Sequence, residues 1–370
     1  MSQSDVDVAI IGGGPAGSSN ALALTRGGLS VAIVERSDYS EWRPGEVLSA
    51  DAANVLARLG IDVGMIISRI PNVASRAIQT AWGSSELVEK HSIFNPYGNG
   101  WNIDRNEFDA ALAIEAENAG AKIFRKTRCL KSLRNNDRWD LVLQNGNTSR
   151  LSAKFLVDAT GRAARMARSI GSKLIVYDDL ISIIGIFEGS SDSADSDMTV
   201  ESTADGWWYL VPLTDRKFLA AFMTDSDIFQ KVHQSAATYW STMIKNTRYI
   251  SSIVGEIPQK VKIEMRNSRI SRLDRFFGKQ WIAIGDAAFS FDPLSGDGII
   301  RAIDSGTESA ELILHASNSS EGFDHYSTRL VNRFNSYLAI RRDYYSFEQR
   351  WKSSSFWSRR QQTRDFKNPV

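Results

Sequence analysis

The sequence predicts an α/β fold in which a Rossmann-like dinucleotide-binding domain is combined with a mostly antiparallel β-sheet domain and C-terminal helices. A glycine-rich turn separates an apolar strand from a helix within residues 7–26, and a second glycine-rich segment follows an apolar strand within residues 280–298. Apolar residues alternate with polar ones between these segments, as at residues 207–223. A chain of 370 residues is too long for one ordinary core, so we expect two lobes.

Residues 7–34 carry the pattern of a complete βαβ unit. Residues 7–11 are mainly apolar and predict a buried parallel strand, residues 18–26 predict a helix, and residues 29–34 predict a second strand. The turn between the first strand and the helix contains Gly12, Gly14, Ala16 and Gly17.

Each part of this unit has a physical reason to bind a dinucleotide. Gly12 permits the tight turn, Gly14 lets the backbone approach a pyrophosphate, and Gly17 permits close helix packing. Glu35 ends the second strand, where a carboxylate accepts hydrogen bonds from a ribose diol. The alternative is a glycine turn without a ligand, which the presence of all these parts disfavours. FAD and NAD both remain open at this point.

Composition excludes several other classes of protein. Hydrophobic residues make up 42% and charged residues 24%, as in a globular protein, and the formal net charge of +1 gives no field for nucleic-acid binding. Cys129 is the single cysteine, so we expect no intramolecular disulfide and no cysteine-rich metal site. We expect no membrane span, and the lack of a signal-peptide pattern favours the cytoplasm.

The segment at residues 280–298 distinguishes the two cofactors. It reads QWIAIGDAAFSFDPLSGDG and precedes a helical run at residues 299–314. It resembles the GD motif of flavoprotein hydroxylases, which implies that Asp286 binds the ribityl chain of FAD. The turn with Pro293, Gly296 and Gly298 would then place a helix N-terminus beside the flavin pyrimidine ring, where reduced flavin carries negative charge. Alternatively, Asp286 caps a helix and the glycines form an ordinary loop.

Two further segments resemble parts of the same flavoproteins. Residues 102–112 resemble a helix start whose arginine, here Arg105, reaches the cofactor. VDATGRAAR, within residues 156–165, resembles a motif with Asp158, Gly161 and Arg165 at similar spacing, but two residues separate its aspartate from its glycine. Asp158 and Arg165 alternatively brace a strand-to-helix turn.

Together these matches resemble the p-hydroxybenzoate hydroxylase-like superfamily of FAD-dependent oxidoreductases, which includes tryptophan halogenases and geranylgeranyl reductases. The resemblance implies FAD as cofactor and a division of the chain into three parts. The FAD-binding domain is expected at residues 1–70, 101–170 and 276–320, the substrate domain at residues 71–100 and 171–275, and a C-terminal helical segment at residues 321–370.

Residues 42–60, 206–227 and 285–298 resemble one subgroup, the flavoproteins that accompany lysine or glycine oxidases in cysteine tryptophylquinone biosynthesis. The resemblance implies oxygenation of a tryptophan in the precursor of a quinone-dependent amino-acid oxidase. NAD(P)H or a separate reductase would supply electrons. The alternatives are a small-molecule aromatic monooxygenase or halogenase, and a flavin-binding maturation chaperone without catalysis. Halogenation is disfavoured because the first lysine is Lys90 and Trp207-Trp208 lacks the halogenase signature.

The catalytic candidates from sequence are Glu46 and His91. Arg36 and Arg43 lie after the second strand, where this superfamily approaches the flavin, and are cofactor-binding candidates. The other interpretations are a structural ion pair between Glu46 and an arginine, and a surface or packing role for His91. Core packing is likewise favoured over substrate stacking for Trp207-Trp208. The basic residues of 341–370 suggest an acidic partner or, more simply, a solvated helix.

Overall fold

The computed structural model describes residues 3–92, 95–189, 197–257, 260–315 and 321–361. These residues group into two compact units, which are described separately. The first unit comprises Met1–Asn72, Asn99–Tyr177 and Arg269–Thr328, and the second comprises Val73–Gly98, Asp178–Ser268 and Arg329–Val370. Residues from 329 onward thus group with the second unit, whereas the sequence analysis gave 321–370 a segment of its own; residues 362–370 lie outside the described part of the chain.

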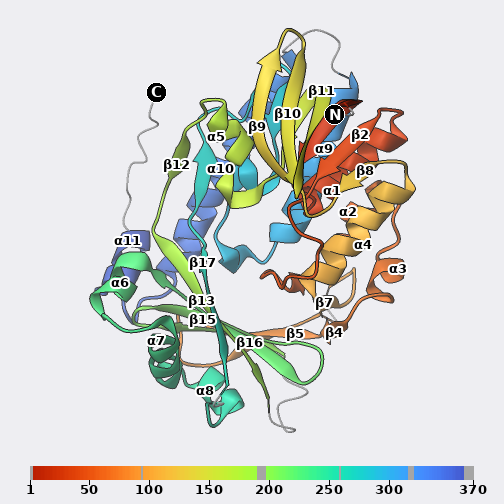
Figure 1. The fold of residues 1–370 in the computed structure, drawn as a ribbon. Coiled ribbons are helices and arrows are strands. Elements are labelled where there is room, and N and C mark those ends of the chain that lie inside the picture. Colours follow the sequence, from red (N-terminus) through yellow and green to blue (C-terminus); the bar gives the residue numbers. More distant parts are fainter. Residues whose placement is uncertain (1–2, 93–94, 190–196, 258–259, 316–320, 362–370) are drawn as a thin grey trace. The chain divides into compact units, whose positions relative to one another are not determined.

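A mixed sheet forms the centre of the first unit (Figure 1). Its strand order is β19-β20-β11-β1-β2-β8, and the long β11 also pairs with a β9–β10 hairpin. The strands are β1 (Gln3–Ile11), β2 (Val31–Val34), β8 (Lys122–Phe124), β9 (Arg128–Asn135), β10 (Arg138–Asn145), β11 (Asn147–Asp158), β19 (Phe277–Gly278) and β20 (Trp281–Ala283). The pairs β20–β11, β11–β1, β1–β2 and β2–β8 are parallel, which confirms the Rossmann-type arrangement.

The helices of the first unit begin with α1, which starts at Pro15 and not at residue 18 because Gly14 occupies the N-cap position and proline is favoured in the first turn. The bounds are α1 (Pro15–Arg26), α2 (Ala52–Arg58), α3 (Val63–Ile67), α4 (Arg105–Asn118), α5 (Arg165–Ser169) and α9 (Gly298–His315). The α10 helix (Glu321–Ser346) contains the boundary between the units at residue 328. No described helix is long and apolar enough to cross a bilayer.

Close packing of α1 on α9 joins the two glycine-rich segments of the sequence. A Cβ atom on Gly306 of α9 would lie 2.1 Å from Ser19 Oγ and 2.4 Å from the carbonyl oxygen of Ala16. The Asn20 side-chain amide donates to the Gly306 carbonyl at 3.0 Å and to Ser309 Oγ at 2.9 Å. Because these contacts hold the helices together, the turns that precede α1 and α9 belong to one site.

Smaller strands complete the first unit. β12 (Leu174–Val176), β18 (Ser271–Leu273) and β21 (Phe289–Ser290) form a three-stranded sheet, and β3 (Val47–Leu48) pairs antiparallel with β7 (Gly100–Ile103). The strand β4 (Asn72–Ser75) spans the point where the chain passes from the first unit to the second.

The second unit contains a seven-stranded sheet of order β17-β13-β16-β15-β14-β5-β6. All its neighbouring strands are antiparallel except β14 and β5, which confirms the expected mostly antiparallel second domain. The strands are β5 (Ala77–Ala81), β6 (Val88–His91), β13 (Leu180–Glu188), β14 (Met198–Thr203), β15 (Gly206–Pro212), β16 (Lys217–Asp225) and β17 (Lys262–Asn267). The shorter helices are α6 (Ser226–Lys231), α7 (Ala236–Met243), α8 (Tyr249–Val254) and α11 (Ser355–Gln361).

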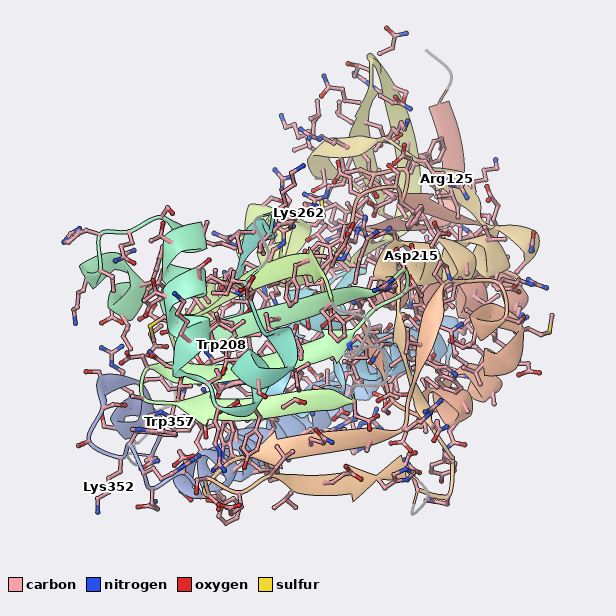
Figure 2. All side chains as sticks on the ribbon, turned by 90° about the horizontal axis from the view of Figure 1, so that it is seen from below. Arg125, Trp208, Asp215, Lys262, Lys352 and Trp357 are labelled. Carbon is pink, nitrogen blue, oxygen red and sulfur yellow. The ribbon has the colours of Figure 1, made fainter. Side chains whose placement is uncertain are left out.

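Aromatic side chains build the core of the second unit. Trp208, labelled in Figure 2, is fully buried, stacks on Phe222 at 4.7 Å between ring centroids and meets Trp240 of α7 edge-on at 5.7 Å. Trp207 is also buried, and its indole N–H donates to Tyr345 Oη at 2.9 Å. The aromatic pair therefore serves core packing, because neither ring is exposed to a ligand.

Several of the basic C-terminal residues are paired within the second unit, whereas Arg364 and Lys367 lie outside the described residues. Arg360 and Arg359 contact the buried carboxylate of Asp225 at 2.6 and 3.0 Å, and Arg359 also reaches Asp227 at 2.7 Å. Arg341 pairs with Asp178 at 2.9 Å. These ion pairs anchor α10 and α11 to the sheet, so neither an acidic partner nor simple solvation accounts for these arginines.

Candidate functional site

Gly12 in the turn between β1 and α1 and Gly17 in the first turn of α1 are required by the fold, whereas Gly14 is not. A Cβ atom on Gly12, whose φ is +110°, would lie 2.2 Å from the Ala159 carbonyl oxygen, and one on Gly17 would lie 1.9 Å from the Gly12 carbonyl oxygen. Gly14 has an ordinary φ of −74°, and no described protein atom lies within 4 Å of the position its Cβ would take. The side-chain direction of Gly14 therefore opens onto free space.

The positive end of the α1 helix dipole and its unpaired backbone amides favour an anion at the start of this helix. The N-cap Gly14 offers no side-chain hydrogen bond to the first backbone amides, and the first turn contains no acidic residue. The amides and the positive end of the helix dipole are thus uncompensated by the side chains of this turn. A phosphate group at this position would meet free N–H donors.

Glu35 closes the other side of this turn. Its Oε2 accepts a hydrogen bond from the Gly13 amide at 2.7 Å, and its Oε1 accepts from the Ser37 amide at 3.0 Å and from Ser37 Oγ at 2.6 Å. Burial alone would raise the pKa of Glu35, but these hydrogen bonds and the charge of Arg43 outweigh it and hold the pKa below its ordinary value. The carboxylate is therefore charged and held in place at neutral pH.

A chain of charged side chains extends from Glu35. Arg43 Nη2 lies 3.0 Å from Glu35 Oε1, and its Nη1 lies 3.3 Å from Asp109 Oδ2. Asp109 also binds Arg105, with 3.1 Å between Arg105 Nε and Asp109 Oδ1. The expected ion pair of Glu46 with an arginine is thus corrected, because Arg43 and Arg105 direct their guanidinium groups to Asp109 and Glu35.

The remaining candidates of the sequence analysis differ in burial. Glu46 is buried at the start of β3, where its Oε2 accepts from the Gly45 amide at 2.8 Å. Arg36 follows β2 and is exposed. His91 is exposed at the end of β6 in the second unit. Glu46 is therefore the only one of these three whose side chain is enclosed by the fold.

Asn102 is a buried polar residue that is not among the candidates from sequence. It lies in β7 opposite Val47 of β3 and is 2% exposed. Neither its Oδ1 nor its Nδ2 has a hydrogen-bond partner among the described residues, and the Oδ1 of the buried Asn106 also lacks one. Buried amides are normally paired, so these unpaired atoms make Asn102 a candidate contact for a bound molecule. The polar residue within the apolar strand WNI was the available signal.

The second glycine-rich segment lies directly against the first. A Cβ atom on Gly285, whose φ is +56°, would lie 2.9 Å from Ala16 Cβ, so Asp286 sits beside the first turn of α1. The Asp286 side chain is 42% exposed, and its Oδ2 lies 3.3 Å from Arg162 Nε. It does not cap a helix through a side-chain hydrogen bond. A half-exposed carboxylate at this position is available to a ligand hydroxyl.

The turn before α9 also contains glycines whose Cβ positions face free space, as at Gly14. Pro293 starts a short 3-10 helix capped by Asp292, whose Oδ1 accepts from the Leu294 amide at 3.0 Å. Gly296 ends it with a left-handed φ of +67°, and no described atom lies within 4 Å of a Cβ on Gly296 or Gly298. The first turn of α9 contains no acidic residue. This turn therefore presents a second helix N-terminus to solvent-accessible space.

Asp158 braces the strand-to-helix turn, which is the alternative role that the sequence suggested for it. Its Oδ1 accepts from Thr160 Oγ1 at 2.6 Å and its Oδ2 accepts from the Ala167 amide at 2.8 Å. Burial raises the pKa of Asp158 above its ordinary value. The Arg165 side chain does not pair with Asp158 and is exposed.

The described residues contain no cluster of three or more potential metal ligands. Cys129 is a free thiol, and burial raises its pKa to about 11.

The fold and this constellation define a flavoprotein. A family described as an FAD binding domain matches residues 5–334, and the chain therefore belongs to this family. It is an FAD-dependent oxidoreductase, which confirms the expected cofactor and the expected enzyme class.

Two curated relatives are similar to this chain over most of its length. The chain is 28% identical over 362 residues to the putative FAD-dependent oxidoreductase LodB of Marinomonas mediterranea, with 96% of each chain covered. It is 22% identical to a tryptophan 2-halogenase of Chondromyces crocatus, over 97% of this chain and 71% of the relative.

Solved structures share the fold at lower identity. The flavin-dependent halogenase CmlS superposes with a TM-score of 0.85 at 23% identity, covering 99% of this chain and 69% of CmlS. The peptidyl tryptophan dihydroxylase QhpG, described as essential for tryptophylquinone cofactor biogenesis, superposes with a TM-score of 0.79 at 24% identity, covering 98% of this chain and 80% of QhpG.

Proposed function

We propose that this FAD-dependent oxidoreductase oxygenates a tryptophan side chain of a partner precursor protein during cysteine tryptophylquinone biosynthesis. The observation that carries the proposal is where the segments typical of that subgroup lie. Residues 42–60 contain Arg43 and Glu46, and residues 285–298 contain Asp286 and the turn before α9. Two of the three resembling segments thus contain residues of the candidate site, whereas the third, residues 206–227, lies in β15, β16 and the start of α6 in the second unit.

The similarity to known proteins supports the same choice. The match to LodB extends over 96% of both chains, whereas the tryptophan 2-halogenase is covered over 71% of its length. QhpG acts on a peptidyl tryptophan, and nearly all of this chain superposes on it. These likenesses favour a protein-borne tryptophan over a free aromatic molecule as substrate.

The residues that would hold FAD follow from the geometry of the first unit. The α1 N-terminus at Gly14 would bind the pyrophosphate, and Glu35 would accept hydrogen bonds from the ribose hydroxyls. Asp286 would bind the ribityl chain, and the N-terminus of α9 at Gly298 would lie beside the flavin ring. Arg43 and Arg105 would act through their ion pairs with Glu35 and Asp109, by fixing the loop that carries Glu46.

Two features of the protein fit these roles. Space is free at Gly14, Gly296 and Gly298, so a ligand backbone or ring can approach the main chain closely. The Asn102 amide, buried and unpaired among the described residues, would find partners in a bound ligand or substrate.

The chemistry divides between cofactor and protein. Bound and reduced, FAD supplies two electrons to O₂, so that one oxygen atom enters a C–H bond of the indole and the other leaves as water. The helix N-terminus of α9 would stabilise negative charge that develops on the ring beside it. Glu46 is the protein group best placed to hold a proton near the substrate, because it is buried and not engaged in an ion pair. NAD(P)H or a separate reductase would provide the electrons.

A small-molecule halogenase or monooxygenase is the second candidate. The halogenase matches favour it, but Lys90, the first lysine, is exposed on β6 of the second unit. The test is co-expression of a candidate quinone-dependent oxidase precursor with and without this protein, followed by peptide mass spectrometry. Added oxygen on one tryptophan only in the presence of the flavoprotein supports the proposal, and turnover of free tryptophan with an unmodified precursor overturns it.

A further inference from the structure

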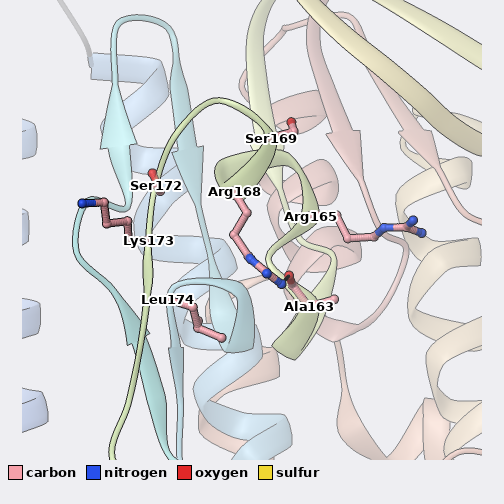
Figure 3. Close-up of a pocket in the computed structure, with 7 residues that line it drawn as sticks. All are labelled: Ala163, Arg165, Arg168, Ser169, Ser172, Lys173 and Leu174. Atoms are coloured by element: carbon pink, nitrogen blue, oxygen red, sulfur yellow. Dashed lines mark hydrogen bonds between the residues drawn. The ribbon is translucent and has the colours of Figure 1, made fainter.

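A hollow in the surface of the first unit collects cations that have no acidic partner. It has a volume of about 720 Å³ and is lined by α5 and the chain that follows it (Figure 3). The lining residues are Ala163, Arg165, Arg168, Ser169, Ser172, Lys173 and Leu174. We refer to this feature as the cationic hollow.

The three cations of the hollow are not used by the fold. Arg165, Arg168 and Lys173 are exposed, and none of them forms an ion pair with a described residue. Arg168 donates only to the Ala163 carbonyl oxygen, at 3.4 Å. The nearby carboxylate of Asp274 accepts from the Lys173 backbone amide at 2.8 Å and not from its ammonium group. By contrast, Arg359 and Arg360 form ion pairs with Asp225 within the second unit.

The arrangement of these cations indicates what kind of anion fits. In Figure 3 the ends of Arg165 and Lys173 point to opposite sides, with Arg168 between them. Charges that spread along a surface match several carboxylates of an extended chain, whereas a phosphate needs donors that converge on one point. None of the lining residues is aromatic, so the hollow also lacks a surface on which a nicotinamide or adenine ring could stack.

We propose that the cationic hollow docks a carboxylate-rich segment of the partner protein, with Arg165, Arg168 and Lys173 each meeting an acidic side chain. This inference rests on the proposed function for the identity of the partner. The docking chemistry itself can be measured without oxygenation, so the failure of one is distinguishable from the failure of the other.

The experiment uses the FAD-loaded protein and a fluorescent decapeptide of alternating glutamate and glycine as probe. Fluorescence anisotropy measures its Kd for the wild type, for the triple variant Arg165→Glu/Arg168→Glu/Lys173→Glu and for the milder Arg165→Gln/Arg168→Gln/Lys173→Gln. We expect binding to the wild type that weakens with added salt, and a Kd raised about tenfold or more in both triple variants. The thermal midpoint of each variant shows that it is folded.

A matched control separates docking from net charge. The variant Lys122→Glu/Lys131→Glu/Lys352→Glu reverses three exposed lysines on other elements and produces the same change in formal charge. It should bind the decapeptide within about twofold of a wild-type Kd, because distant exposed charges are largely screened. Equal weakening in this control overturns the proposal. Binding of NADPH or inorganic phosphate to the cationic hollow, without binding of the decapeptide, overturns the proposal as well and assigns the hollow to a phosphate ligand.

Discussion

A Cβ atom on Gly17, in the first turn of α1, would lie 1.9 Å from the carbonyl oxygen of Gly12, whereas one on Gly14, between them in the sequence, would meet no described atom within 4 Å. The segment at residues 12–17 therefore contains glycines of two kinds. Gly12 and Gly17 are required for the chain to fold, and Gly14 is required only if a ligand occupies the space in front of it.

Replacing Gly14 therefore separates cofactor binding from folding. Gly14→Leu should reduce FAD affinity by about 100-fold, because the side chain fills the space of the pyrophosphate and blocks its hydrogen bonds. The free energy of unfolding of the FAD-free protein should change by about 1 kcal/mol or less, which is the cost of a poor N-cap residue. Flavin titration and urea denaturation measure the two effects.

Gly17→Ala is the matched control for this experiment. Its added methyl group meets backbone, so we expect a loss of about 3 kcal/mol of stability or no folded protein. Retention of FAD by Gly14→Leu, or destabilisation equal to that of Gly17→Ala, would show that the phosphate site has been placed incorrectly.

Asp286→Ala should raise the Kd for FAD about tenfold while leaving the fold intact. The half-exposed carboxylate contacts Arg162 and is otherwise available to a ligand hydroxyl, and a hydrogen bond to a charged group is worth about 1.5 kcal/mol or more. Asp304→Ala is the control, since Asp304 lies on α9 and its carboxylate pairs with the exposed Arg58. Equal FAD affinity in both variants would remove Asp286 from the site.

The low pKa of Glu35 predicts a pH-dependent contribution to stability. The folded pKa lies below the ordinary value of 4.5, so the charged form favours the folded state. This stabilisation is fully present above about pH 4.5 and is lost as the pH falls through the lowered folded pKa. The difference in free energy of unfolding between wild type and Glu35→Gln should thus be largest near neutral pH and shrink below pH 4.5. A difference that grows on acidification would contradict this account of Glu35.

The C-terminal arginines should stabilise the second unit. Arg360→Ala removes a partner from the buried Asp225 carboxylate and should cost about 3 kcal/mol, because a buried charge is left with less compensation. Lys352→Ala is the control, since the Lys352 side chain projects outward at the periphery (Figure 2) and should change stability by about 0.5 kcal/mol or less. Tryptophan fluorescence during urea unfolding compares the two variants. Equal midpoints would show that α11 is not held by this ion pair.

The sequence predicted the parts of the fold that local patterns encode. The βαβ unit, the glycine segment near residue 290 and the antiparallel character of the second unit follow from periodicity and glycine spacing. Element ends were less accurate: β1 begins at Gln3 and not at residue 7, because its first residues are polar yet pair with β11.

The contacts between distant segments could not be predicted from local patterns. Arg43 pairs with Asp109, 66 positions along the chain, and the expected partner Glu46 lies only three residues away. The basic C-terminal residues suggested an exposed surface, but Arg359 and Arg360 both pair with the buried carboxylate of Asp225 at the end of β16. Asn102 was missed for the same reason, since its lack of partners is visible only once its surroundings are known.

The most direct test of the central claim follows the oxygen atom. The purified FAD-loaded protein, a candidate precursor of a quinone-dependent amino-acid oxidase and a reductant, either NADPH or a flavin reductase, are incubated under ¹⁸O₂, and the precursor is digested for mass spectrometry. We predict that one tryptophan-containing peptide gains ¹⁸O, and that Gly14→Leu abolishes this gain. An unmodified tryptophan with both reductants, while the bound flavin is reduced and reoxidised, would contradict the proposed function.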